Sequence, residues 1–304
     1  IEAMRKEGYD DGFSAAITAG SAVIGPIFPP SIPLVIYGVI AGASIGNLFL
    51  AGMVPGIILA LALCIYVCYI ANKRNYPSGR KYAGMEFIKM TVSAVPALLT
   101  PIILLMGIYT GIMTATEAGA VAALYALLIS VFAYRSITLS EFIQVLKNTV
   151  KSTGQIGIML GAAYVFSYVI AVENLPSLAG NLILSFATTK VSFLVFVNIL
   201  LFILGMLLDS AVLQLVLLPI LCPIAQSFGI DMVHFGVVFT LNTMIGLCTP
   251  PFGMLLFIVT GISGEKMNTI IKEVMPMVFV MVLVLILVTF VPDVIMWLPR
   301  LFGR

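Results

Sequence analysis

One acidic residue, Asp209, lies deep inside a long apolar stretch, residues 191–228. A carboxylate at the centre of a bilayer costs roughly 2.5–3.5 kcal/mol, so such a residue usually serves an ion or a substrate. All fifteen lysines and arginines are assigned to loops or segment ends, which leaves a bound cation as the simplest compensating charge. Na⁺ is the cation we expect, because it binds oxygen ligands such as a carboxylate. Alternatively, Asp209 or Ser210 caps the helix that follows, and the two roles are compatible.

Two clusters of glycine and proline interrupt other apolar stretches. GPIFPPSIP, residues 25–33, divides the stretch 12–43, and GLCTPPFG, residues 246–253, divides the stretch 232–261. Proline removes a backbone donor and clashes with the preceding turn, so we expect two half-helices with an unwound middle in each case. In hydrocarbon, unwound backbone is tolerated only where it lines a cavity. Its carbonyls can bind Na⁺ or H⁺, and half-helix N-termini attract an anionic substrate. The simpler alternative is a proline kink in each of two ordinary helices.

The candidate site residues follow from these three places in the chain. The candidate sodium ligands are Asp209, Gly205, Ser210, Thr249, Asn242, Gly246, Gly25 and Pro29. The candidate substrate contacts are Ser31, Pro30, Ser21, Thr243, Gln214 and Pro250. Local capping of freed backbone is the alternative role for each polar side chain. We expect no cofactor besides Na⁺ and no transition metal, and we expect Cys64 and Cys68 to be buried hydrophobes.

Two other residues invite a chemical interpretation but have structural ones. Glu117 lies between two apolar stretches, where Thr114 or Thr116 can cap the next helix and Glu117 favours its N-terminus. His234, the only histidine, is a possible proton carrier, but a structural hydrogen bond is the preferred interpretation.

The elements that must position these residues are membrane-spanning helices. The 304 residues are 61% hydrophobic and 9% charged, with a mean hydropathy of +1.17, whereas a soluble domain is about 45–50% apolar and about 25% charged. This composition excludes a soluble enzyme, a disordered regulator and a nucleic-acid binder that relies on a basic patch. Long unbroken apolar runs exclude a transmembrane barrel. We therefore expect an all-α polytopic membrane protein.

The expected elements follow from the length that a span requires. Besides the two broken stretches, we expect spans at 47–71, 96–113, 116–134, 152–172 and 274–298, an amphipathic stretch to residue 95 and a surface helix at 140–151. A short apolar piece ends near residue 187. Residues 191–228 are too long for one span and short for two, so we expect a re-entrant hairpin of two half-length helices.

Basic residues give the expected orientation, because they accumulate in cytoplasmic loops. If residues 191–228 enter and leave on the outer side, twelve of the fifteen basic residues fall on one side. Only Lys190, Arg300 and Arg304 fall on the other. The C-terminus is then periplasmic. The chain opens with Ile1 inside a charged stretch and has no signal peptide, so we expect an N-terminal portion to be missing.

The two breaks align with each other at a shift of 221 residues. IGPIFPPSIPL (24–34) falls on IGLCTPPFGML (245–255), and Pro55 falls on Pro276. The orientation above makes these repeats inverted, a pattern typical of secondary transporters. We expect residues 1–71 to form the first-repeat part of a transport domain, 72–151 the scaffold, and 152–304 the second repeat.

Three long motifs resemble the large membrane subunit of tripartite ATP-independent periplasmic (TRAP) transporters. They are AMRKEGYDDGFSAAITAGSAVIGPIFPPSIPLVIYG, GIYTGIMTATEAGAVAALYALL and LGMLLDSAVLQLVLLPILCPIAQSFGIDMVHFGVVFTLNTMIGLCTPPFG. The resemblance covers essentially the whole chain, although the family's first helices and first hairpin would precede Ile1. It implies a sodium-coupled importer of small organic acids in the bacterial inner membrane, with an elevator mechanism. Its partners would be a periplasmic binding protein and a small four-helix membrane subunit. LGMLLDSAVLQ and VIYGVIA look most like the sialic-acid branch, and C4-dicarboxylates and other sugar acids stay open.

Two other functions are alternatives to this one. A stand-alone sodium–carboxylate symporter, with no binding protein, has the same paired breaks. An intramembrane enzyme would need a nucleophile–base or metal set, and Asp209 and the distant His234 do not form one. A glycine-rich phosphate loop with lysine is also absent from the sequence, so ATP is not expected to drive transport.

Overall fold

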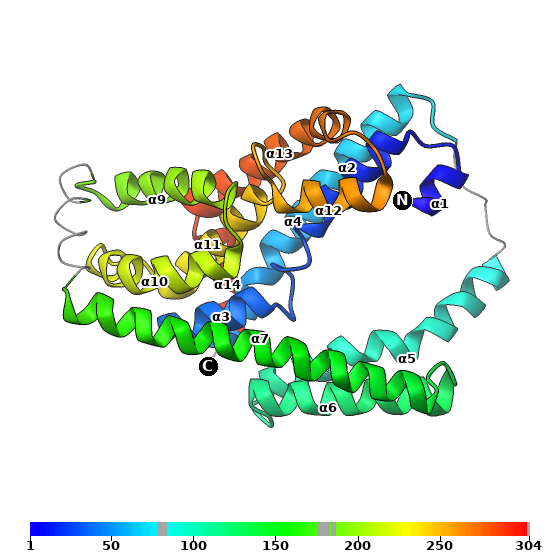
Figure 1. Ribbon diagram of the computed structural model, residues 1–304, viewed down its shortest axis with the longest axis horizontal. Helices are drawn as coiled ribbons and strands as arrows, with labels where there is room; N and C mark the ends of the chain where they lie inside the picture. Colours follow the sequence, from blue (N-terminus) through cyan, green and yellow to red (C-terminus); the bar gives the residue numbers. More distant parts are fainter. Residues whose placement is uncertain (78–83, 175–182, 184–186, 303–304) are drawn as a thin grey trace. The chain divides into compact units, whose positions relative to one another are not determined.

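The computed structural model describes residues 1–77, 84–174, 183 and 187–302, and all regular elements in these parts are helices (Figure 1). Six described helices are long and apolar enough to cross a membrane: α4 (Ile45–Lys73), α5 (Gly84–Tyr109), α6 (Ala115–Leu128) with its π-helical continuation η1 (Ile129–Ala133), α7 (Leu139–Val172), α10 (Ser210–Ser227) and α13 (Met267–Phe290). The shorter helices are α1 (Glu2–Lys6), α2 (Asp11–Ala22), α3 (Ile32–Ala41), α9 (Lys190–Gly205), α11 (Met232–Gly246), α12 (Met254–Ser263) and α14 (Asp293–Phe302). The expectation of an all-α polytopic membrane protein is thus confirmed.

The chain divides into two compact units. One contains Ile1–Gly79 and Ile170–Arg304, and the other contains Arg80–Val169. In the second unit, α5 packs on α6. Tyr125 of α6 donates a hydrogen bond to the carbonyl of Pro96 in α5 (3.1 Å), and Tyr134, which follows η1, donates to the carbonyl of Ser93 (2.8 Å). α5 carries Pro96 and Pro101 in its interior without a break, as membrane helices often do.

Both glycine–proline clusters interrupt helices in the first unit. α2 ends at Ala22 and α3 begins at Ile32, while α11 ends at Gly246 and α12 begins at Met254. The Pro29–Pro30 and Pro250–Pro251 peptide bonds are both cis. The predicted half-helices with unwound middles are confirmed, and the alternative of simple kinks is wrong.

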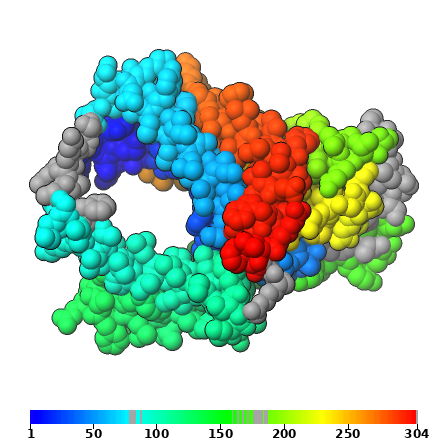
Figure 2. All heavy atoms as spheres, turned by 180° about the vertical axis from the view of Figure 1, so that it is seen from behind, coloured from blue at the N-terminus to red at the C-terminus, as the bar shows by residue number. Residues whose placement is uncertain are grey.

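Close backbone contacts hold the broken helices in place. A Cβ added to Gly236 of α11 would lie 2.4 Å from the ring of Tyr37 of α3, and the Tyr37 hydroxyl donates to the carbonyl of Met232 (2.7 Å). A Cβ on Gly52 of α4 would lie 2.5 Å from the carbonyl oxygen of Ile27, inside the first break. α14 also packs against α4 (Figure 2). Glycine therefore lets α4 and α11 approach the interrupted chain closely.

An ion network joins three ends of helices in the same unit. The Arg74 guanidinium, which follows α4, donates two hydrogen bonds to the Glu273 carboxylate of α13 (2.9 and 2.8 Å). It also pairs with Asp10, which precedes α2, at 3.3 Å, and it lies over the ring of Phe13. Bidentate pairing of this kind fixes geometry as well as charge.

Three sequence-based boundaries are wrong. The amphipathic stretch before residue 95 and the span 96–113 form one helix, α5, and the surface helix 140–151 and the span 152–172 form one helix, α7. Polar residues at 151–155 do not break a helix, since none of them is proline. The last span is displaced: α13 starts at Met267, ends at Phe290, and gives way at Pro292 to a separate helix, α14. Cys64 and Cys68 are exposed on α4 rather than buried. The apolar piece near residue 187 lies largely outside the described residues.

Candidate functional site

The stretch 191–228 folds as a hairpin of two helices, α9 and α10, as predicted. Residues 206–209 form the turn between them. Asp209 is the N-cap of α10, and its Oδ1 accepts a hydrogen bond from the backbone N–H of Ala211 at 2.9 Å. The capping role foreseen for Asp209 is therefore confirmed, and only one of its carboxylate oxygens is used for it. Whether the hairpin re-enters the membrane stays a prediction.

The tip of this hairpin packs directly on the second break. A Cβ on Gly246 would lie 2.6 Å from the carbonyl carbon of Gly205, so the two glycines bring backbone against backbone. Beside them the hydroxyls of Ser210 and Thr243 share a hydrogen bond of 2.9 Å. The Gly253 N–H, at the far end of the break, donates to the carbonyl of Met206 in the hairpin turn (3.1 Å). Four of the predicted sodium or substrate residues thus meet at one place.

A cavity of about 260 Å³ opens at this junction. Its walls come from the hairpin turn, the second break and α12, and they are Gly205, Met206, Leu207, Leu208, Asp209, Leu247, Phe252, Met254, Phe257 and Ile258. Asp209 is the one charged residue among them. α12 begins at this cavity with Gly253 as its N-cap, and no side chain caps it. Backbone carbonyls take its first N–H groups instead: those of Gly253, Leu255 and Leu256 donate to Met206, Leu247 and Gly253 at 3.1, 3.1 and 2.7 Å. The partial positive charge of the helix end still favours an anion.

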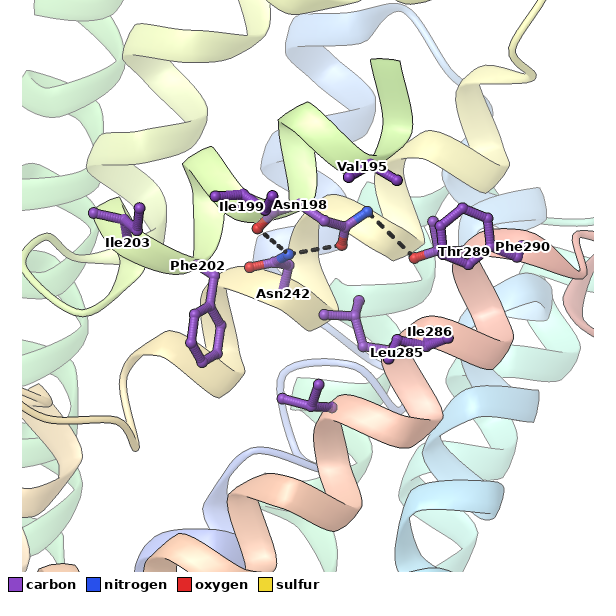
Figure 3. Close-up of a pocket in the computed structure, with 11 residues that line it drawn as sticks. Val195, Asn198, Ile199, Phe202, Ile203, Asn242, Leu285, Ile286, Thr289 and Phe290 are labelled. Carbon is purple, nitrogen blue, oxygen red and sulfur yellow. Dashed lines mark hydrogen bonds between the residues drawn. The ribbon is translucent and has the colours of Figure 1, made fainter. Parts of the chain in front are cut away.

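Three asparagine and threonine side chains form a second polar cluster, between α9, α11 and α13 (Figure 3). The Asn242 Nδ2 donates to the Oδ1 and the backbone carbonyl of Asn198, at 2.7 and 3.0 Å. The Asn198 Nδ2 donates to the carbonyl of Leu194 (2.8 Å) and contacts the Thr289 hydroxyl (3.4 Å). The cluster borders a cavity of about 350 Å³ whose other walls are apolar.

Several buried polar atoms near the hairpin lack a hydrogen-bond partner. Gln214 and Asn242 are both 0% exposed. Both amide atoms of Gln214, the Oδ1 of Asn242 and the Oγ1 of Thr240 are unpartnered. α10 and α11 are joined by a short loop and run antiparallel, with Ser210 facing Thr243, so Gln214 and Thr240 each lie one turn further into the same interface. Buried orphan groups are rare in proteins and call for a ligand or an ion.

The first break is built differently. Ser31 caps α3, accepting from the N–H of Leu34 (3.2 Å) and donating to the carbonyl of Pro26. Ser21 is exposed, and its hydroxyl donates to the carbonyl of Thr18 in its own helix (3.3 Å). Gly25 and Pro30 are exposed, whereas Pro29 is buried. In the described part of the chain, no hydrogen bond joins these residues to the hairpin tip. The Cys248 thiol of the second break donates to the carbonyl of Ala19 in α2 (3.1 Å), three residues before that helix ends.

Other sequence-based assignments have clear outcomes. Thr249 is buried and donates to Ile245 (2.8 Å), and Pro250 follows it at the break. His234 is buried and hydrogen-bonds the carbonyl of Val288 at 3.0 Å, so its structural role is confirmed. Thr114 and Glu117 form a reciprocal capping box at the start of α6, also as expected.

Asn198 and Thr289 were missed by the sequence analysis. Asn198 is the one amide in the apolar sequence of α9, KVSFLVFVNILLFILG, and that isolation was the available signal. Thr289 carries no such signal, because a threonine near the end of an apolar helix is common.

The comparisons with known proteins cover nearly the whole chain. The profile of the family described as "Tripartite ATP-independent periplasmic transporter, DctM component" matches residues 1–294. The chain is 41% identical to the sialic acid TRAP transporter large permease protein SiaM of Vibrio cholerae, over 99% of this chain and 71% of that protein. It is 39% identical to the sialic acid TRAP transporter permease protein SiaT of Haemophilus influenzae, over 99% of this chain and 49% of that one. A C4-dicarboxylate TRAP transporter large permease protein of Pseudomonas aeruginosa is 34% identical, over 100% of this chain and 71% of its own length.

All three relatives are named as permeases, which confirms that the chain is not an enzyme. The structure has the two broken helices and the hairpin that the sequence predicts. The family profile covers all of them, since it matches residues 1–294. The chain therefore belongs to the family of DctM components, the large permease subunits of tripartite ATP-independent periplasmic transporters.

Proposed function

We propose that the chain is the membrane subunit of a sodium-coupled secondary transporter that imports a small organic acid across the bacterial inner membrane. A periplasmic binding protein would deliver the acid, and a small four-helix membrane subunit would complete the complex. The C-terminus would be periplasmic. Family membership supports this class of function.

The observation that carries the proposal is the junction of the hairpin tip with the second break. A carboxylate, that of Asp209, and the positive end of the α12 helix dipole, at Met254, lie at the same cavity. The two attract opposite charges: Asp209 a cation, and the α12 N-terminus the carboxylate of an organic acid. A site that holds both favours binding of Na⁺ and substrate together, which is the requirement for coupled uptake.

The remaining predicted residues are assigned on the same basis. Ser210, Thr249 and the carbonyls around Gly205 and Gly246 would complete an oxygen shell with Asp209 and Asn242. Gly25 and Pro29 would contribute carbonyls from the first break. The candidate substrate contacts are Thr243, Gln214 and Pro250 from the hairpin side, with Ser21, Pro30 and Ser31 from the first break. Gln214 is the strongest of these, because its buried amide has both a free donor and a free acceptor.

The mechanism we propose is an elevator built from inverted repeats. The unit that holds both breaks and the hairpin would be the moving transport domain, with residues 1–71 and 152–304 as its two repeat-derived parts. Residues 72–151 would belong to the scaffold. The division of the chain into two compact units supports this assignment in outline, although residues 152–169 belong to the second unit.

We propose sialic acid as the substrate. Two relatives at 41% and 39% identity are named as sialic acid permeases, whereas a C4-dicarboxylate permease stands at 34%. A sugar acid carries one carboxylate and several hydroxyls, and Gln214 supplies the kind of amide that hydrogen-bonds hydroxyls.

The test is uptake by the complete transporter in proteoliposomes. Radiolabelled sialic acid or succinate would be supplied with its binding protein, with an inward sodium gradient or with potassium in its place. We expect sialic acid uptake that requires both sodium and the binding protein. Full-rate uptake without the binding protein would favour the stand-alone symporter, and uptake indifferent to sodium would remove the coupling ion from the proposal.

A further inference from the structure

Asn242 is held by hydrogen bonds whose polarity can be read along a chain of groups. The first group is the backbone carbonyl of Leu194, which can only accept a hydrogen bond. The Asn198 side chain must therefore present its Nδ2 to that carbonyl, at 2.8 Å. This places the Asn198 Oδ1 on the opposite side of its amide, where it accepts from the Asn242 Nδ2 at 2.7 Å.

The same chain fixes the orientation of the Asn242 amide. Its Nδ2 also donates to the backbone carbonyl of Asn198 (3.0 Å), a second acceptor that excludes a flipped amide. Both N–H bonds of Asn242 are thus directed at Asn198. The Asn242 oxygen lies on the side of the amide away from Asn198 (Figure 3). It is fully buried and has no hydrogen-bond partner.

An oriented, buried and unpartnered oxygen is costly unless something binds it, since leaving such a group unsatisfied costs about 1–3 kcal/mol. Asn242 lies one helical turn before Gly246 on α11, so the two share the face that packs on α9 and the hairpin tip. Asp209 supplies one negative charge at that tip. A neutral amide oxygen adds a ligand without adding charge, which matches a monovalent cation.

We propose that Asn198 is a positioning residue, which orients the amide of Asn242 so that its carbonyl oxygen faces the coupling cation. Asn198 does not contact the ion. Its role is exerted through Asn242, and the inference rests on the sodium coupling proposed above. Thr289 steadies the same side chain only weakly, at 3.4 Å.

The test compares three substitutions in the complete transporter in proteoliposomes. Asn198→Leu keeps the approximate shape of the side chain and removes its hydrogen bonds to Asn242 and Leu194, while the backbone carbonyl of residue 198 stays as the one acceptor for Asn242. Asn198→Ser keeps the polarity, because a serine hydroxyl can donate to the carbonyl four residues earlier and still accept from Asn242. Ile199→Ala removes apolar packing from the wall of the same cavity and serves as the packing control.

We expect Asn198→Leu to raise the sodium concentration for half-maximal uptake about fivefold, the effect of losing one orienting hydrogen bond. The maximal rate at saturating sodium, and the substrate KM measured there, should stay near wild type. Asn198→Ser should restore the sodium dependence to within about twofold, and Ile199→Ala should leave it unchanged.

Two outcomes would overturn the inference while leaving the proposed function intact. One is an unchanged sodium half-saturation in Asn198→Leu while wild type depends on sodium. The other is an equal loss of maximal rate in all three variants, which would mark a purely structural role. If wild-type uptake ignores sodium, the proposed coupling itself fails. Should Asn198→Leu not assemble, Asn198→Ala replaces it, with sodium-dependent thermal stabilisation of the purified complex as the readout.

Discussion

Asp209 combines a helix cap with a negative charge, and one substitution separates them. Asp209→Asn keeps an oxygen that can accept from the Ala211 N–H and removes the charge. We expect the sodium half-saturation of uptake to rise on the order of tenfold, a change of about 1.4 kcal/mol, with folding and assembly preserved. Uptake against sodium concentration is the measurement. Asp209→Ala, which removes the cap as well, should also lower the free energy of unfolding by about 1 kcal/mol. An unchanged sodium response in Asp209→Asn would reduce the residue to a cap.

Gly246 and Gly205 form a matched pair for testing the hairpin junction. A Cβ on Gly246 meets the backbone of Gly205 at 2.6 Å, whereas a Cβ on Gly205 meets its neighbours only at 3.3 Å and beyond. Gly246→Ala must push the hairpin away from α11, at a cost of about 1–3 kcal/mol of overpacking, and should nearly abolish uptake. Gly205→Ala should retain most of it. Uptake rates normalised to protein in the membrane would decide, and equal effects would argue against a tight junction.

At the scale of single residues, the sequence predicts which residues belong to the site better than it predicts which of them contact one another. The sequence predicts the residues of the junction because each lies at or beside a break or a hairpin tip. These residues are Gly205, Ser210, Thr243 and Gly246. Their pairing depends on how two helices are aligned, which no local pattern encodes. For the same reason the link from Asn198 to Asn242 was not foreseen, although an asparagine in an apolar helix is visible in the sequence.

The start of α6 has a reciprocal capping box. The Thr114 N–H and hydroxyl both donate to the Glu117 carboxylate at 2.8 Å, and the Glu117 N–H donates to the Thr114 hydroxyl at 3.3 Å. Glu117→Gln replaces a charged acceptor by a neutral one, so its hydrogen bonds are weaker, and the variant should unfold at a lower temperature than wild type at pH 7. Thermal unfolding of the purified complex is the measurement. Glu141, boxed with Thr138 in the same way at α7, should behave alike, and unchanged unfolding temperatures in both variants would contradict a stabilising role of the boxes.

α14 is a separate helix, although the sequence predicts part of it as the end of the last span. Its position suggests where it lies relative to the membrane. Ile295, Met296 and Pro299 are buried, and α14 packs on α4, while Trp297 and Leu301 stay exposed on another side of the helix. α14 begins three residues after α13 ends, so it starts at the boundary of the membrane. An amphipathic helix in that place is expected to lie in the interface, with Trp297 among the headgroups.

Trp297 is the only tryptophan in these 304 residues, which makes this placement measurable. The fluorescence difference between the wild type and Trp297→Phe isolates its emission. We expect lipids brominated near the headgroup to quench this emission strongly, and lipids brominated near the chain end to quench it weakly. Efficient quenching by aqueous iodide with no lipid effect would place α14 in water. Insensitivity to both would indicate that another protein segment covers it.

The predicted elements show which signals can be read without a structure. Both broken helices were placed within a few residues, because proline pairs beside glycine leave the backbone few alternatives. The false boundary at α5 lies at Pro96, which the helix carries in its interior. The false boundary at α7 lies at the polar residues 151–155, although lysine, serine and glutamine are compatible with helix. At Pro292 the signal was present, since the residue before proline favours an extended conformation.

At the scale of the whole molecule, the orientation of the chain depends on the hairpin of α9 and α10. At 1.5 Å per residue the two helices are roughly 24 and 27 Å long, each somewhat short of the bilayer core of about 30 Å. Length alone does not decide the matter, because α10 is also apolar and long enough to count among the candidate spans. The distribution of charge favours a chain that leaves residues 191–228 on the side where it entered, because twelve basic residues then share one side against three.

Lys272 and Arg300 are the positions that decide between the two arrangements. If the chain leaves residues 191–228 on the side where it entered, Lys272, in the first part of α13, is cytoplasmic and Arg300 of α14 is periplasmic. If residues 191–228 cross the membrane only once, both assignments are exchanged. Single cysteines would replace each residue in a background without Cys64, Cys68, Cys222 and Cys248, with Lys73→Cys as the cytoplasmic reference. A membrane-impermeant maleimide on intact cells should label Arg300→Cys at once, and should label Lys272→Cys and Lys73→Cys only after permeabilisation. Outside labelling of Lys272→Cys alone would show that residues 191–228 make a single net crossing, and would remove the inverted relation between the two breaks. Outside labelling of Lys73→Cys would reverse the whole orientation, because the basic residues would then lie on the periplasmic side.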